Sequence, residues 1–306
     1  MVEIMLSVPA YLDRIGFAGV SAPSAETLRA LHRAHMLAVP FENLDIHLGR
    51  PIVCDEAGFI HKIVNERRGG FCYELNGAFA ALLRALGFQV TLLSARVARA
   101  DGSTNGPEFD HLTLRVDLPE HQSDNSWTDA SRSEAPWLAD VGFGDSFVEP
   151  LRLEPDLEQA QTGRIYRLVE VEGVFYLEAK ADSAAAGRGE GDDQWKRQYS
   201  FTQQPRQLSE FAGMCHYHQT SPESHFTRHR ICSLATPHGR ITLSDLKLIE
   251  TRDGRREERD LSGEEQWSAT LRDLFRVELP ELALTLSSLR QRTSQIVGLG
   301  GIGLDP

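Results

Sequence analysis

Apolar residues in the first ninety positions recur three and four residues apart, the spacing that puts them on one face of a helix. This pattern predicts helices over Pro9–Phe17, Ala25–Met36 and Glu74–Leu86. Ser24 before the second helix and Gly87 after the third are residue types that cap helix ends. We therefore expect the N-terminal part of the chain to be helical.

After residue 88 apolar and polar residues alternate, which is typical of strands joined by turns. The strands are expected at Gln89–Val97, His111–Val116, Trp137–Gly142, Arg164–Val171, Val174–Ala179 and Arg240–Leu248. Two helices return at Gly263–Phe275 and Leu282–Arg292, and we expect the polar segments 119–136 and 181–193 to be mobile surface excursions. Helices come first and strands follow, so the order predicts an α+β fold and not a doubly wound parallel sheet.

Composition and charge narrow the class of protein. The chain has 306 residues, of which 41% are hydrophobic and 25% charged, values typical of a folded globular protein. A net charge of −12 argues against a general nucleic-acid binder, which needs a basic surface. The four cysteines are too few for a disulfide scaffold, and neither a secretory signal nor a membrane-spanning run is present. We expect a cytoplasmic protein that binds neither nucleic acid nor membranes.

The most informative cysteine is Cys72. Gly69 and Gly70 allow a tight turn just before the amphipathic helix, so Cys72 is expected at or near the helix N-terminus. Unpaired N–H groups and the positive end of the helix dipole stabilise a thiolate there, which is the reactive form of cysteine. Position alone leaves a small buried core thiol equally open.

Two later residues favour a catalytic interpretation. His111 begins an alternating strand, and Asp140 lies between the apolar Ala139 and Val141. A carboxylate in such a setting is costly unless it accepts a strong hydrogen bond, and an imidazole N–H is a suitable donor. Cysteine, histidine and aspartate can then act as nucleophile, base and orienting group.

The sequence resembles the arylamine N-acetyltransferase family in five segments, which keep the order and approximate spacing of that family. The segments are Val39–Leu44, Arg68–Asn76, His111–Leu114, Asp140–Gly144 and Thr220–Phe226. The resemblance implies an N-terminal helical bundle, a central β-barrel-like domain and a C-terminal α/β lid with a papain-like Cys-His-Asp arrangement. We assign residues 1–88 to the helical domain with the nucleophile, 89–205 to the barrel domain with histidine and aspartate, and 206–306 to the lid and C-terminal tail.

The resemblance also implies the chemistry. Cys72, His111 and Asp140 would form a triad that moves an acetyl group from acetyl-coenzyme A (acetyl-CoA) to an aromatic amine or hydrazine through an acetyl-cysteine, in a ping-pong sequence. His111 would take the thiol proton and later help to remove the amine proton. Glu42 and Arg68 are interpreted as a structural ion pair that positions the Cys72 loop.

Further contacts are nominated by the same resemblance. Phe41, Phe143 and Phe226 would form the apolar wall for the aromatic acceptor, and Tyr217 and Ser224 would touch coenzyme A. We expect no metal, because the Cys215–His218 cluster of soft ligands lacks a second cluster at zinc spacing.

Two other functions stay open from the sequence. A cysteine hydrolase or a transglutaminase-like enzyme could use the same triad, and a binding module could hold Cys72 as an inert core thiol. The oligomeric state is also open, a homodimer included.

Overall fold

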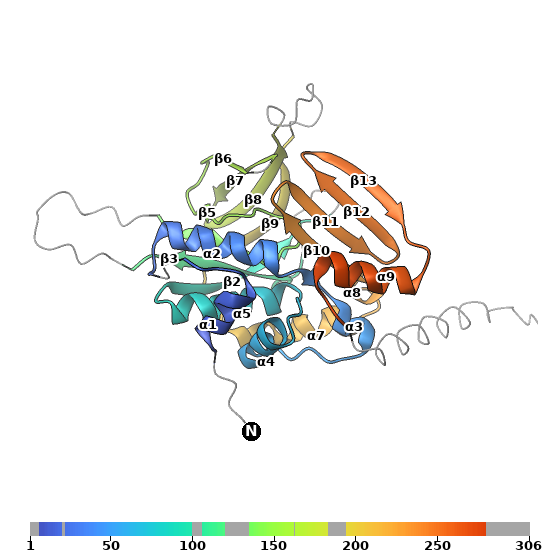
Figure 1. The fold of residues 1–306 in the computed structure, drawn as a ribbon. Helices are drawn as coiled ribbons and strands as arrows, with labels where there is room; N and C mark the ends of the chain where they lie inside the picture. The colour runs from blue at the N-terminus through green and yellow to red at the C-terminus, as the bar shows by residue number, and fades with distance from the viewer. Residues whose placement is uncertain are drawn as a thin grey trace, which may run out of the picture.

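The computed structural model describes residues 6–19, 22–99, 106–119, 135–161, 163–182 and 194–279. An N-terminal group of helices packs against an eight-stranded sheet and a five-stranded sheet, which stand next to each other in Figure 1. Helices and antiparallel strands are thus segregated along the chain, which confirms the predicted α+β class.

The three predicted N-terminal helices are present with shifted ends. They are α1 (Val8–Arg14), α2 (Ala25–Ala38) and α5 (Cys72–Ala85). Ser24 caps α2 by accepting the Thr27 N–H, as its position predicted. Between α2 and α5 lie short elements that periodicity did not predict, because each is too brief to repeat. They are α3 (Leu44–Leu48), α4 (Glu56–Ile60) and a π-helical turn (His61–Asn65).

The larger sheet has the strand order β5-β4-β3-β2-β9-β8-β7-β6. Its strands are β2 (Gln89–Val97), β3 (His111–Asp117), β4 (Trp137–Ala139), β5 (Leu151–Arg152), β6 (Gln159–Gln161), β7 (Arg164–Val171), β8 (Val174–Ala181) and β9 (Lys196–Thr202). Side-chain amides join the two edge strands: Gln159 bonds both the N–H and the C=O of Arg152. The sheet therefore curls into the barrel-like form that the family resemblance implied.

The predicted strand Trp137–Gly142 is shorter than expected. It ends at Ala139, because the Asp140 carboxylate accepts the Gly142 N–H at 3.0 Å and closes a local turn. This turn matters for the site, since it lifts Asp140 out of the strand ladder and leaves its carboxylate free to meet other partners.

The smaller sheet has the order β1-β10-β11-β12-β13. Its strands are β1 (Phe41–Glu42), β10 (Ile231–Thr236), β11 (Gly239–Ser244), β12 (Lys247–Arg252) and β13 (Arg255–Asp260). The prediction of one strand over Arg240–Leu248 was wrong. The chain reverses at Asp245 and Leu246, with Asp245 at φ +48°, so Ser244 pairs with Lys247. This turn contains no glycine, and the alternation of apolar and polar residues continues across it. The sequence pattern therefore predicted a single strand.

The remaining helical elements are short, and the last two of them, after residue 263, pack on the smaller sheet, whereas Phe211 and Cys215 join the core of the N-terminal helices. These elements are a 3₁₀ turn (Leu208–Phe211), α7 (Ala212–Thr220), α8 (His225–Arg228), α9 (Glu264–Thr270) and a final π-helical turn (Leu271–Phe275). The last two elements correspond to the predicted helix Gly263–Phe275. The predicted helix Leu282–Arg292 and most of the segments 119–136 and 181–193 lie outside the described residues. The division into domains at residues 88 and 205 stays a prediction.

Within the described ranges, no helix combines the length and the apolar character needed to cross a membrane.

Candidate active site

Cys72 is the first residue of α5, as the glycine pair before it predicted. The chain can approach this position only because Gly69 and Gly70 lack side chains. A Cβ on Gly69 would lie 2.0 Å from the Pro40 carbonyl oxygen, and one on Gly70 would lie 2.6 Å from the Glu74 Cβ. The two glycines therefore let the loop pass under β1 and α5 and bring Cys72 to the wall of a pocket.

Opposing effects act on the Cys72 thiol. Burial raises its pKa well above the ordinary value, and the carboxylates of Asp110 and Asp140 act in the same direction. Backbone hydrogen bonds from Leu112 and Tyr73 favour the thiolate instead. A lone thiolate is thus disfavoured, so ionisation of Cys72 requires a cation that forms nearby at the same time.

His111, the first residue of β3, can supply that cation. Its Nε2 lies 2.6 Å from Oδ2 of Asp140, and both side chains are buried. An ionised carboxylate only accepts, so Nε2 carries the proton and Nδ1 keeps a lone pair. His111 thereby combines a free basic nitrogen with a carboxylate that stabilises its protonated form.

Asp140 is fully buried and is held by several hydrogen bonds. Burial alone would raise its pKa, but His111, Asn76 and the Gly142 N–H outweigh burial and hold the pKa below its ordinary value. Asn76 of α5 donates to Asp140 Oδ1 at 2.9 Å and accepts the Val141 N–H at 2.9 Å. The carboxylate is therefore ionised and fixed relative to the helix that begins at Cys72.

A buried histidine that the sequence did not single out supports the backbone of the same residue. His32 of α2 accepts the Asp140 N–H at Nε2, at 3.1 Å, and its Nδ1 donates to the Val148 carbonyl at 2.8 Å. Burial lowers the pKa of His32 to about 4, so the ring is neutral. Sequence periodicity only places His32 on the inner face of α2, because its partners lie more than one hundred residues away.

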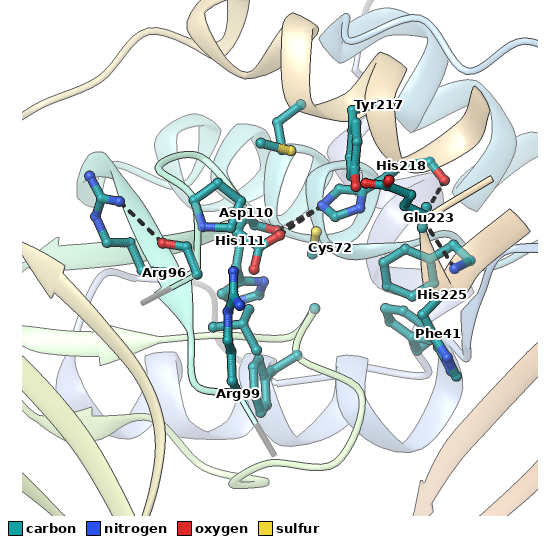
Figure 2. A pocket seen from close by; sticks show the side chains of 18 of the residues that line it. Phe41, Cys72, Arg96, Arg99, Asp110, His111, Tyr217, His218, Glu223 and His225 are labelled. Carbon is teal, nitrogen blue, oxygen red and sulfur yellow. Dashed lines mark hydrogen bonds and ion pairs between the residues drawn. The ribbon is translucent and has the colours of Figure 1, made fainter. Parts of the chain in front are cut away.

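The pocket has a volume of about 1090 Å³ and opens next to Cys72 (Figure 2). Seven of the eight nominated site residues line it, and Asp140 lies behind His111. The seven are Phe41, Cys72, His111, Phe143, Tyr217, Ser224 and Phe226. Rings of Phe41 and Phe226 are 6.0 Å apart, and Phe143 packs edge-on against His111 at 5.2 Å.

Tyr217 and Ser224, the two residues nominated to touch coenzyme A, differ in whether their hydroxyl groups can bind a ligand. Tyr217 is 37% exposed, and no hydrogen bond of its hydroxyl to a described residue is found. Ser224 is buried: its hydroxyl donates to the His218 carbonyl at 2.9 Å and accepts the Phe226 N–H at the start of α8. The hydroxyl proton of Ser224 is thus already engaged in a hydrogen bond within the protein.

The pocket also contains ionisable residues to which the sequence analysis gave no role in this site. They are Arg96, Arg99, Asp110, His218, Glu223, His225 and Arg228. Asp110 precedes His111, and His218 belongs to the Cys215–His218 cluster, but spacing alone gave no reason to pair Asp110 with His218. The arginines carried no local signal, since isolated arginines are common on any surface.

Beneath the Cys72 loop lies a buried ionic cluster of three carboxylates and two cations. Arg68 donates from Nε and Nη2 to Glu42 Oε1, at 3.0 and 2.7 Å, which confirms the predicted ion pair. Asp45 accepts from Arg68 at 3.1 Å and from Lys62 at 2.8 Å, and Lys62 also bonds Glu74 at 2.8 Å. Burial raises the pKa of Glu74 to about 7, as expected where carboxylates outnumber cations.

We expect Arg68→Ala to lower the free energy of unfolding by about 3–5 kcal/mol, because the buried Glu42 carboxylate loses both short hydrogen bonds to its cation and keeps only Lys62 at 3.7 Å as a cationic partner. Arg68→Lys should lose less, since it keeps the charge but not the planar fork. Arg67→Ala is the matched control: this side chain is 60% exposed and should change stability by less than about 0.5 kcal/mol. Urea unfolding of the three variants checks this. Equal stability of Arg68→Ala and wild type would contradict a structural role.

The Cys215–His218 cluster is split by the fold. Cys215 and His218 are buried, whereas His216 and Tyr217 are exposed on the other side of α7. Among the residues that the structure describes, no group of three histidine, cysteine, aspartate or glutamate side chains is arranged to hold a metal ion.

Comparisons with known proteins agree with this fold. A family model described as N-acetyltransferase matches residues 24–284. The pineal gland arylamine N-acetyltransferase isozyme NAT-3 of Gallus gallus is 33% identical over 300 residues, which cover 93% of this chain and 99% of that protein. The arylamine N-acetyltransferase of Mycolicibacterium smegmatis is 34% identical over 278 residues, which cover 89% of this chain and 92% of that protein.

Solved structures are similar over the same length. The M. smegmatis arylamine N-acetyltransferase superimposes with a TM-score of 0.79 at 30% identity, covering 93% of this chain and 98% of that one. The Mycobacterium marinum enzyme in complex with CoA has a TM-score of 0.78 at 29% identity, covering 92% and 98%. Fold and family match together define an acetyltransferase. The chain belongs to the arylamine N-acetyltransferase family.

Proposed function

We propose that the protein transfers the acetyl group of acetyl-CoA to aromatic amines or hydrazines through an acetyl-thioester on Cys72. One observation carries the proposal: a cysteine at a helix start shares a pocket with a histidine whose Nε2 is bonded to a buried carboxylate. This arrangement provides a nucleophile, a base and an orienting group within one cavity.

In the first half-reaction, His111 Nδ1 takes the Cys72 proton as sulfur attacks the thioester carbonyl. The imidazolium that forms lies against Asp140, and backbone hydrogen bonds from Leu112 and Tyr73 support the negative sulfur. The carbon–sulfur bond to coenzyme A then breaks, and the coenzyme A thiolate receives the proton from His111. The products are acetyl-Cys72 and free coenzyme A.

In the second half-reaction, a neutral amine attacks the acetyl carbonyl on Cys72. The carbon–nitrogen bond forms, the amine loses a proton to a base of the pocket, and the Cys72 thiolate leaves. The aromatic rings of Phe41, Phe143 and Phe226 suit a flat acceptor, since burying its ring contributes about 25 cal/mol per Å² of apolar area.

The pocket also suits the charge of coenzyme A. Arg96, Arg99 and Arg228 line it against the two carboxylates Asp110 and Glu223, although the chain as a whole is acidic. Guanidinium groups pair well with phosphate. Tyr217 is the nominated neutral contact with an available hydroxyl, whereas Ser224 contributes mainly to the shape of the wall.

We expect an aromatic amine, and not water, to be the preferred acceptor of acetyl-Cys72. A bound aniline or hydrazide gains the effective molarity of a positioned nucleophile and is mostly unprotonated near neutral pH, unlike the lysine side chain. Release of coenzyme A would be compared without acceptor, with an aniline or hydrazide, and with a lysine peptide. Stimulation by the aromatic acceptor alone is expected. Equal release in all three, or cleavage of peptides and esters without coenzyme A, would favour the hydrolase.

Cytoplasmic location and the open question of a homodimer stay predictions from the sequence.

A further inference from the structure

A second histidine–carboxylate pair lines the same pocket and has no part in the mechanism above. His218 of α7 places its Nε2 3.1 Å from Oδ1 of Asp110 and 3.3 Å from the Asp110 carbonyl oxygen. Both residues line the pocket that contains Cys72 and His111. In Figure 2 the Cys72 thiol is seen between the rings of His111 and His218.

The hydrogen bonds of His218 determine its tautomer. An ionised carboxylate and a backbone carbonyl only accept, so Nε2 of His218 carries the proton and Nδ1 has the free lone pair. No partner of Nδ1 is found among the described residues. The arrangement repeats that of His111 and Asp140, in which a carboxylate holds Nε2 and leaves Nδ1 basic.

The surroundings of His218 hold the ring in the pocket wall. It is 7% exposed, and its ring packs against Phe226 at 5.2 Å and Tyr73 at 6.1 Å. The Ser224 hydroxyl bonds the His218 carbonyl and fixes the end of α7 against α8. Because Phe226 is a nominated wall of the acceptor site, a ring bound there would present its amine near the imidazole.

We propose that His218, supported by Asp110, is the base that takes the proton from the acceptor amine in the second half-reaction. Without His218, this proton would have to be taken by His111. As the amine nitrogen bonds to the acetyl carbon, its proton passes to Nδ1 of His218, and the carbon–sulfur bond breaks with its electron pair on Cys72. His218 then releases the proton to solvent, and the Cys72 thiolate is protonated again from solvent by way of His111.

This inference rests on the proposed function, since it needs an acetyl-enzyme, but the two can fail separately. The test measures both half-reactions of His218→Gln by rapid mixing. The first is the burst of coenzyme A release from acetyl-CoA without acceptor. The second is the loss of acetyl from pre-acetylated enzyme when an aniline is added. Glutamine keeps a polar side chain of similar length but cannot act as a base.

We expect His218→Gln to be acetylated at the wild-type rate and to transfer its acetyl group to aniline about 100-fold more slowly. Asp110→Asn should also slow transfer, whereas its acetylation should be unchanged or faster, because the Asp110 carboxylate opposes ionisation of Cys72. His216→Gln is the matched control, since His216 is exposed on the same helix and lies outside the pocket lining. It should behave like wild type in both steps.

The other possible results of this experiment each contradict either the role of His218 or the proposed function. Acetylated His218→Gln that transfers at the wild-type rate overturns the inference and leaves the proposed function intact. Equal slowing of both half-reactions means that the pair only fastens α7 to the barrel, which also overturns it. Wild-type enzyme that never becomes acetylated refutes the proposed function itself.

Discussion

Cys72→Ala is expected to lower kcat/KM for acetyl transfer by at least about 10⁴-fold while the protein stays folded. The thiol is the group that would carry the acetyl between the two substrates, and the pocket offers no second cysteine, because Cys54, Cys215 and Cys232 do not line it. Alanine fits the same helix start without strain. Thermal unfolding and steady-state kinetics with acetyl-CoA and an aniline test the expectation together.

Cys232→Ala serves as the control for loss of a buried thiol. Cys232 lies in β10, 1% exposed, in the apolar core of the smaller sheet. We expect this variant to keep nearly full turnover and to lose some stability. Cys72→Ser should be nearly as inactive as Cys72→Ala, since a hydroxyl is far harder to ionise beside His111 than a thiol. Substantial transfer by Cys72→Ala would exclude the covalent route.

Asp140→Asn is expected to lower turnover by about 10³- to 10⁴-fold. The neighbours of the new amide dictate its orientation. Asn76 Nδ2 and the Gly142 N–H both donate to Oδ1, so the amide oxygen stays there and the NH₂ group faces His111. His111 must then accept at Nε2 and carry its proton on Nδ1. That tautomer has no lone pair toward Cys72, and the imidazolium loses its carboxylate.

Turnover and the unfolding temperature are both measured for Asp140→Asn. Because three hydrogen bonds around position 140 can persist, we expect a small change in unfolding temperature and a large loss of rate. Asp145→Asn is a control in the same glycine-rich turn, where the carboxylate pairs with Arg164 and Arg240, away from Cys72. A variant at position 140 that unfolds like wild type and keeps full turnover would remove Asp140 from the mechanism.

The sequence was most informative where a local rule fixes local geometry. Gly69 and Gly70 predicted the turn before α5, and the structure begins that helix at Cys72. Alternation predicted β2 and the start of β3 at His111, because a half-buried strand repeats every two residues. The ion pair of Glu42 and Arg68 followed from the family resemblance, because the two residues lie in two of the matched segments.

Contacts between distant segments could not be predicted in this way. His32 meets Asp140 across 108 residues, and His218 meets Asp110 across a similar separation, with no pattern in either segment that names its partner. The reversal at Asp245 was missed for a different reason: an aspartate adopts a positive φ there without the glycine that usually signals it. Packing decides the two long-range contacts, whereas the reversal reflects a local preference of aspartate.

The central claim is that Cys72 carries the acetyl group. Intact-mass analysis after mixing the protein with acetyl-CoA, without acceptor, tests it most directly, followed by peptide mapping and then by addition of an aniline. The account predicts one added acetyl group, located on Cys72 and removed by the aniline. No adduct, or an adduct on Cys54, Cys215 or Cys232, would contradict it.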